Sequence, residues 1–190
     1  KNIIKKILII LLIIVIIIVL ATIGIGNYFV NYAILRTGNG GDREVKNTEV
    51  VEVASIDNEI EKIIEKNRKQ EKQHASEWSN TVKNEKVEVT AKDGITLKGT
   101  EYINDEQTNN WVIVLHGYRS SPESVISVGM HFSEKGYNVL IPYMRATGES
   151  EGEYIGMGWL DKDDLKCWID LIIKQNNNAN IVLHGSSMGA

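Results

Sequence analysis

The residues best suited to chemistry lie at the end of the chain, in the run His184-Gly185-Ser186-Ser187-Met188-Gly189-Ala190. Gly185, Ser187 and Gly189 form the pattern Gly-x-Ser-x-Gly, which is typical of a nucleophile elbow. In such an elbow the chain turns sharply from a strand into a helix, and the serine at the tip adopts a strained backbone conformation. Glycine is needed on both sides because a Cβ atom would clash at the turn. The pattern predicts that the hydroxyl of Ser187 projects beside backbone N–H groups that can bind an oxyanion.

A five-residue pattern also arises by chance, and a simple turn rich in glycine and serine is the alternative interpretation. The surrounding sequence favours the elbow. The apolar residues 181–183 directly precede the motif and predict a buried strand. A second apolar run, residues 111–115, also predicts a buried strand, and it ends in His116-Gly117-Tyr118.

The elements around these motifs predict an α/β domain. Residues 86–90 and 95–100 alternate in polarity on either side of Lys92-Asp93-Gly94, as in a half-solvated β-hairpin. After the hairpin, predicted strands at 111–115, 137–141 and 180–183 alternate with predicted helices at 121–136 and 159–175. This order predicts a largely parallel sheet with right-handed crossovers, flanked by helices.

The N-terminal segment predicts a membrane anchor. Residues 7–25 are apolar and uncharged apart from the polar Thr22, and in a helix they span about 28 Å, close to the hydrocarbon thickness of a bilayer. Tyr28, Phe29 and Tyr32 follow, as in an aromatic belt. A cleaved signal peptide is the alternative. The lysines that precede the segment indicate a cytoplasmic N-terminus, so the remainder is expected outside the cytoplasm as the domain of a single-pass membrane protein.

Five segments describe the organisation that we expect. They are a basic N-terminus (1–6), a transmembrane anchor (7–26), a juxtamembrane linker (27–55), an amphipathic helix (56–83) and a partial catalytic domain that ends at the elbow (84–190). The amphipathic helix is expected to lie on the domain or near the membrane surface; a coiled-coil face is the alternative.

Charge and cysteine content narrow the classes of partner and fold. The chain has 21 basic and 25 acidic residues, and three of the lysines precede the apolar segment. The remaining part is therefore acidic, so we expect no nucleic-acid partner and no attraction to anionic lipid. The one cysteine, Cys167, excludes an internal disulfide and is expected to be a small buried residue rather than a reactive thiol.

With these motifs in place, residues 75–190 resemble the bacterial α/β-hydrolases that carry an N-terminal membrane segment and are related to serine-aminopeptidase-like esterases. The resemblance rests on five blocks of sequence. They are residues 114–118, 134–140, 145–152, 155–159 and 184–190. In the third block Thr147 stands where the family usually has histidine, which affects loop packing rather than chemistry.

The resemblance implies a role for each site residue. Ser187 would be the catalytic nucleophile, and the backbone N–H groups of Tyr118 and Met188 would form the oxyanion hole. His116, Gly117, Gly185 and Gly189 would support the two motifs. The family places its triad acid and base after later strands, so the chain is expected to be the N-terminal portion of a longer protein.

The remaining polar residues are expected to be structural. His116 is assigned a packing role, His131 a place on a helix face, and His184 an orientation away from the elbow tip; His74 lies far upstream. Asp161, Asp163 and Asp164 are interpreted as ordinary partners of a helix N-terminus, with a metal site as the alternative. Arg119 and Arg145 are expected at solvated positions, although either could orient a substrate carboxylate.

The expected function is that of a serine hydrolase acting on a small-molecule ester or related acyl substrate, through an acyl-enzyme and with no cofactor or metal. Esterase, peptidase and acyltransferase activities remain open. The alternative is a non-catalytic, membrane-tethered protein with a hydrolase fold, or an inactive fragment. The 190-residue chain itself is expected to be inactive, because none of its four histidines is placed to serve as the base.

Overall fold

The computed structural model describes residues 2–36, 55–105 and 107–190, and the chain divides into two units, residues 1–41 and 42–190. The first unit is helix α1, Asn2–Ile34. None of its residues is buried, and the helix is long and apolar enough to cross a membrane. A signal sequence near the N-terminus would meet the same criterion. The polar Thr22 is satisfied within the helix, because its hydroxyl donates to the carbonyl oxygens of Ile18 and Val19 at 3.0 and 2.8 Å.

Helix α1 corrects one expected boundary. The juxtamembrane linker was expected from residue 27, but residues 27–34 continue the helix to Ile34. Glycines 24 and 26 have open space around them and do not end it, because the apolar sequence continues beyond them. Of the expected linker, residues 37–54 lie outside the described residues.

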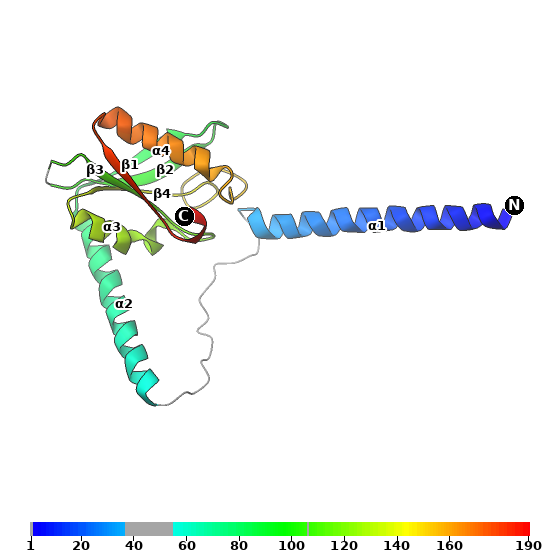
Figure 1. Cartoon of the computed structure of the whole chain (residues 1–190), viewed down its shortest axis with the longest axis horizontal. Helices are drawn as coiled ribbons and strands as arrows, with labels where there is room; N and C mark the ends of the chain where they lie inside the picture. The colour runs from blue at the N-terminus through cyan, green and yellow to red at the C-terminus, as the bar shows by residue number, and fades with distance from the viewer. Residues whose placement is uncertain (1, 37–54, 106) are drawn as a thin grey trace. The chain divides into compact units, whose positions relative to one another are not determined.

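The described part of the second unit starts with helix α2, Ser55–Thr81, which agrees with the helix expected over 56–83. Five strands follow, interleaved with helices (Figure 1). The strands are β1 (Asn84–Thr90), β2 (Thr96–Tyr102), β3 (Asn110–Leu115), β4 (Asn138–Pro142) and β5 (Asn180–Gly185). The helices are η1 (Pro122–Ser124), α3 (Ile126–Ser133), α4 (Asp161–Gln175) and η2 (Ser187–Gly189), where η marks a 3-10 helix.

The sheet has the strand order β1-β2-β4-β3-β5 and is mixed rather than largely parallel. The hairpin β1–β2 is antiparallel, as expected, and β2 also pairs antiparallel with β4. Only the β4–β3 and β3–β5 pairs are parallel. The sequence pattern identified the hairpin but not its place beside β4, which depends on contacts between distant segments.

Two apolar cores fill the space on either side of the sheet. On β3, Trp111 and Ile113 belong to the core that includes Trp168 and Ile172 of α4. The alternate residues, Val112 and Val114, belong to the other core, against which Trp78 of α2 and Phe132 of α3 pack. Figure 1 shows α3 and α4 on opposite sides of the sheet. This period of two is what a strand covered on both faces requires.

Strand β5 differs from the buried strand that its sequence predicts. Val182 and Leu183 are 38% and 51% exposed. Within the part of the chain that the structure describes, β5 pairs with β3 along one edge. An apolar strand is buried only where other layers cover it, and the described residues supply β5 with a neighbouring strand on one edge.

Candidate active site

The Gly-x-Ser-x-Gly motif forms a sharp turn at the end of β5. Ser187 is the first residue of η2 and has a φ of 55°, in the left-handed region that non-glycine residues seldom adopt. The turn is closed by two backbone hydrogen bonds of 3.0 Å, from Gly189 to Ser186 and from Ala190 to Ser187. A serine held in this conformation at a strand-to-helix turn is the geometry that defines a nucleophile elbow.

The two glycines of the motif are required by close backbone contacts. A Cβ atom on Gly185 would collide with the carbonyl group of Gly189 and lie 2.5 Å from Cα of Ala190. A Cβ atom on Gly189 would lie 2.7 and 2.8 Å from the carbonyl oxygens of His116 and Leu115. Both glycines therefore allow the turn to fold back tightly, and Gly189 also allows it to rest against the end of β3.

The register of the parallel pair brings the two predicted motifs together. Leu115 on β3 lies opposite Gly185 on β5, and the N–H of Ser186 donates to the carbonyl oxygen of Leu115 at 3.0 Å. Gly117 and Ser187 each come two residues after this pair. A Cβ atom built on Gly117 would lie 3.2 Å from Cβ and 3.8 Å from Oγ of Ser187. The backbone of the His116-Gly117-Tyr118 segment thus lies directly against the serine.

The two predicted oxyanion-hole residues adjoin this contact. Met188 is the second residue of η2, and the first N–H groups of a helical segment have no partner within it. Tyr118 follows Gly117 in a tight turn that is closed by a 3.2 Å hydrogen bond from Ser120 N to Gly117 O. Its hydroxyl accepts a hydrogen bond from Nε of Arg119 at 2.9 Å, and Arg119 has a φ of 48°. The role of the Tyr118 and Met188 backbone N–H groups as oxyanion donors stays a prediction.

His116 is fully buried, and both of its ring nitrogens are engaged. Nε2 accepts a hydrogen bond from the N–H of Met144 at 3.2 Å, so the proton lies on Nδ1, which donates to the carbonyl oxygen of Gly117 at 3.0 Å. Burial lowers the pKa of His116, which agrees with a neutral ring. The side chain therefore joins the turn after β3 to the loop after β4, as the expected packing role requires, and it has no free nitrogen for Ser187.

Thr147, where the resembling family has histidine, contributes to the same junction. Its hydroxyl lies 3.3 Å from Nε2 of His116 and donates to the carbonyl oxygen of Met144. A threonine therefore keeps a hydrogen-bonding side chain at this position.

The other three histidines are also placed away from a catalytic role. The ring of His184 packs edge-to-face against Phe132 of α3, with 6.1 Å between centroids. His131 forms ion pairs with Glu71 of α2 at 2.6 Å and with Glu134 at 3.0 Å. His74 is exposed on α2. Within the described residues, none of these rings has an interaction with Ser187.

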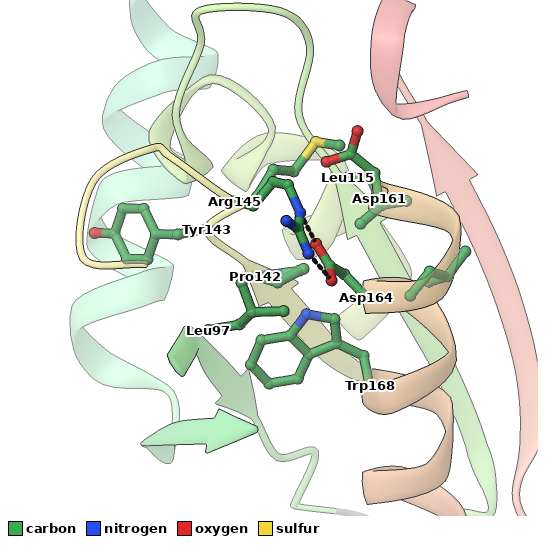
Figure 2. A pocket seen from close by; sticks show the side chains of 10 residues that line it. Leu97, Leu115, Pro142, Tyr143, Arg145, Asp161, Asp164 and Trp168 are labelled. Atoms are coloured by element: carbon green, nitrogen blue, oxygen red, sulfur yellow. Dashed lines mark hydrogen bonds and ion pairs between the residues drawn. The ribbon is translucent and has the colours of Figure 1, made fainter. Parts of the chain in front are cut away.

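Behind the loop that follows β4 lies a small cavity of about 20 Å³, roughly the space of one water molecule (Figure 2). Its wall contains Arg145, which is 5% exposed and not at the solvated position that we expected. Arg145 forms a bidentate ion pair with Asp164 of α4, with both distances 2.7 Å, and a further pair with Asp93 at 2.8 Å. These contacts occupy its guanidinium group, so Arg145 holds the loop in place and cannot orient a substrate carboxylate.

The acidic residues at the start of α4 have separate partners. Asp161 is buried, and its Oδ2 accepts a hydrogen bond from the N–H of Gly158 at 2.7 Å, while Oδ1 has no partner in the structure. Burial raises the pKa of Asp161. Asp163 is partly exposed and pairs with Lys166 and Lys92, which lower its pKa to about 2. The described residues contain no cluster of three or more His, Cys, Asp or Glu that could hold a metal ion.

A larger cavity of about 400 Å³ borders the elbow on the α4 side. Its walls are mostly apolar and include Leu115, Met144, Leu165, Leu183, Met188 and Gly189. The space therefore borders the motif through Gly185, Met188, Gly189 and Ala190.

Comparison with known proteins places this geometry in a class. No family model matches the chain. The uncharacterized protein YqkD of Bacillus subtilis (strain 168) is 32% identical over 98 residues, which are 51% of this chain and 32% of YqkD. The structure of the esterase Pf2001 from Pyrococcus furiosus is 31% identical with a TM-score of 0.53, over 60% of this chain and 45% of the esterase. A putative α/β hydrolase from Agrobacterium tumefaciens is 20% identical with a TM-score of 0.50, over 55% of this chain and 50% of that protein.

The chain therefore has a partial α/β-hydrolase-like fold, preceded by an apolar helix. It spans about a third of the length of YqkD and less than half of that of Pf2001. The likeness to Pf2001 supports a hydrolase class.

The sequence indicated Ser187 and the glycines, but it missed the Arg145–Asp164 pair that fixes the adjoining loop. An arginine three residues after a buried strand, followed further along the chain by an acidic helix start, was the available signal.

Proposed function

We propose that this chain is the N-terminal part of a membrane-anchored serine hydrolase that acts on esters or related acyl compounds. The observation that carries the proposal is the contact between Gly117 and Ser187 at an elbow whose glycines cannot be replaced without collision. The likeness to the Pf2001 esterase supports an ester as the substrate class.

In the proposed reaction Ser187 Oγ attacks the carbonyl carbon of the substrate while its proton passes to a histidine base. The carbonyl oxygen becomes an oxyanion and accepts hydrogen bonds from the N–H groups of Met188 and Tyr118. The oxyanion then collapses, the C–O bond to the leaving group breaks, and the base returns its proton to the departing alcohol. Water attacks the acyl-enzyme by the same sequence and releases the acid and free Ser187.

We assign the base and the acid that orients it to residues that follow Ala190 in the whole protein. Two observations support this assignment. The four histidines of the chain are engaged in other contacts or lie on α2, as described above. YqkD and Pf2001 are also each more than twice as long as the segment that matches this chain.

Labelling with a fluorophosphonate probe tests the assignment of Ser187. The full-length protein should be labelled covalently, Ser187→Ala should not, and Ser186→Ala should keep its labelling, because Ser186 precedes the strained position in an extended conformation. Labelling of both variants would remove Ser187 from the mechanism. Absence of labelling in the wild-type protein, together with a folded domain, would favour the non-catalytic alternative.

Helix α1 is proposed as an uncleaved anchor, with the domain outside the cytoplasm. The protein should then remain with membranes during carbonate extraction. Recovery in the soluble fraction with a new N-terminus near Asn27 would identify a cleaved signal instead.

A further inference from the structure

Helix α2 has two parts with different surroundings. Its C-terminal part packs on the domain: Ala75 is fully buried, and the ring of Trp78 lies 4.7 Å from that of Tyr102. Glu71 forms the 2.6 Å ion pair with His131 of α3. These contacts hold the helix firmly at one end.

The N-terminal part of α2 extends beyond α3 (Figure 1) and carries an apolar face with no cover in the described structure. Ile60, Ile63 and Ile64 are 50%, 53% and 44% exposed, and their spacing places them together on one side of the helix. Ile60 and Trp78 are five helical turns apart and lie on the same face. The face that binds the domain at one end of α2 therefore continues as an exposed stripe, defined here as Ile60, Ile63 and Ile64.

The area of the stripe argues against a second copy of the chain as its partner. Three half-exposed isoleucines offer on the order of 100–200 Å² of apolar surface. A stable specific complex buries about 800 Å² on each partner. A bilayer needs no such area when the helix is already tethered beside it, because the tether raises the effective concentration of the surface.

The chain between α1 and α2 provides such a tether. Residues 35–54 separate the end of α1 from the start of α2, and a chain of that length reaches at most about 70 Å. The charged residues around the stripe are of both signs and nearly balance, among them Glu59, Glu61, Lys62, Glu65, Lys66, Arg68 and Lys69. Because these charges nearly balance, attraction to anionic lipid adds little, and binding to a bilayer would depend on burial of the apolar stripe.

We propose that the exposed stripe of α2 inserts into the interface of the bilayer that holds α1, so that α2 connects the membrane surface to the domain. This inference rests on the proposed anchoring by α1. The isoleucines enter the boundary between headgroups and acyl chains, and the lysines and arginine extend toward water. Because Trp78 and Glu71 fix α2 to the domain, the insertion also sets the position of the domain above the membrane.

A fluorophore whose emission depends on its surroundings tests the insertion. In the full-length protein, with Cys167 and every other native cysteine changed to serine, a single cysteine is introduced by Ile60→Cys or by Lys69→Cys and labelled with a nitrobenzoxadiazole group. Positions 60 and 69 lie on opposite sides of the helix, so the second is the matched control. The protein is reconstituted in phosphatidylcholine vesicles with and without a nitroxide-labelled lipid.

Emission at position 60 should shift to shorter wavelength and be quenched at least 2-fold by the nitroxide lipid, while position 69 should stay water-like. Adding Ile63→Ser and Ile64→Ser should abolish the change at position 60.

A blue shift at position 60 without quenching by the nitroxide lipid would show that protein covers the stripe and would overturn the proposal. If that shift grew with protein density, the covering protein would be a second copy. Water-like emission at position 60, in vesicles from which carbonate does not extract the protein, would overturn it as well while leaving the anchor intact. Release by carbonate would instead refute the anchoring by α1 on which the proposal rests.

Discussion

Strands β3 and β5 have similar apolar sequences but different environments. On β3, Val112, Ile113 and Val114 are fully buried. On β5, Val182 and Leu183 are about half exposed. The difference follows from position, because β3 lies between β4 and β5 and contributes to both cores, whereas β5 pairs with β3 alone among the described strands. Burial of an apolar strand is therefore a property of its neighbours.

The carboxyl ends of the same two strands also differ. The end of β5 holds a strained serine between two glycines, which is a feature of local sterics. The end of β3 supplies backbone to that serine and is positioned by His116, through hydrogen bonds to Gly117 and Met144. In the proposed mechanism, β5 provides the reactive group and β3 provides its surroundings.

The largest expected effect is the loss of hydrolytic activity when no catalytic base is present beside the serine. The 190-residue chain should hydrolyse p-nitrophenyl acetate no faster than its Ser187→Ala form, because the nitrogens of His116 are occupied and no other described histidine contacts the serine. Absence of a triad partner typically lowers the rate by three or more orders of magnitude. Turnover well above that of the mutant would show that His116 or His184 acts as the base.

Alanine substitutions at the ends of β5 and β3 should lower labelling to different extents. Gly185→Ala should lower fluorophosphonate labelling of the full-length protein by about 100-fold or more, because its Cβ meets rigid backbone and displaces the serine. Gly117→Ala should cost about 10-fold, since its contacts of 3.2 Å need only a small shift. Gly136→Ala, at a positive φ but in open space, is the control for backbone strain. Equal losses of labelling in Gly185→Ala and Gly117→Ala would contradict the different roles given to the two strand ends.

Truncation of an apolar side chain should lower the free energy of unfolding more on β3 than on β5. Ile113→Ala should lower the free energy of unfolding of the 190-residue chain by about 2–5 kcal/mol. Leu183→Ala should lower it by less than about 1 kcal/mol, because half of its surface is already in water. Urea unfolding in detergent, followed by tryptophan fluorescence, measures both. A loss at Leu183 as large as that at Ile113 would mean that β5 is covered.

The smallest expected effect is a pH dependence at the helix layer that covers β3. Glu134 and Glu71 raise the pKa of His131 above its usual 6.5, so the protonated ring stabilises the contact between α2 and α3. The stabilisation should be complete well below pH 6.5 and lost as the pH rises through the raised pKa. Since His131 is half exposed, solvent screening limits it to less than about 1 kcal/mol.

Urea unfolding of the wild type and His131→Gln at pH 5.5 and 8.5 measures this effect. The difference between the two proteins should be larger at pH 5.5, and Glu71→Gln should reduce it. A difference that is larger at pH 8.5 would reverse the sign of the assignment.

Features that depend on neighbouring residues could be predicted from the sequence. The apolar run of α1, the alternation of the hairpin and the Gly-x-Ser-x-Gly turn were all predictable, because helix periodicity, strand periodicity and Cβ clashes act within a few residues. The predicted elements of the domain occur in the expected order. Ser187, Gly185 and Gly189 were proposed as site residues on the same local grounds.

Features that join distant segments could be established from the folded structure but not from the sequence. Folding placed β2 beside β4, left β5 exposed, buried Arg145 against Asp164 and brought Gly117 against Ser187. These outcomes depend on which surfaces remain after all the elements have packed. A strand or an arginine with the same sequence can be buried or solvated, since the free energy of its environment comes from partners that lie tens of residues away along the chain.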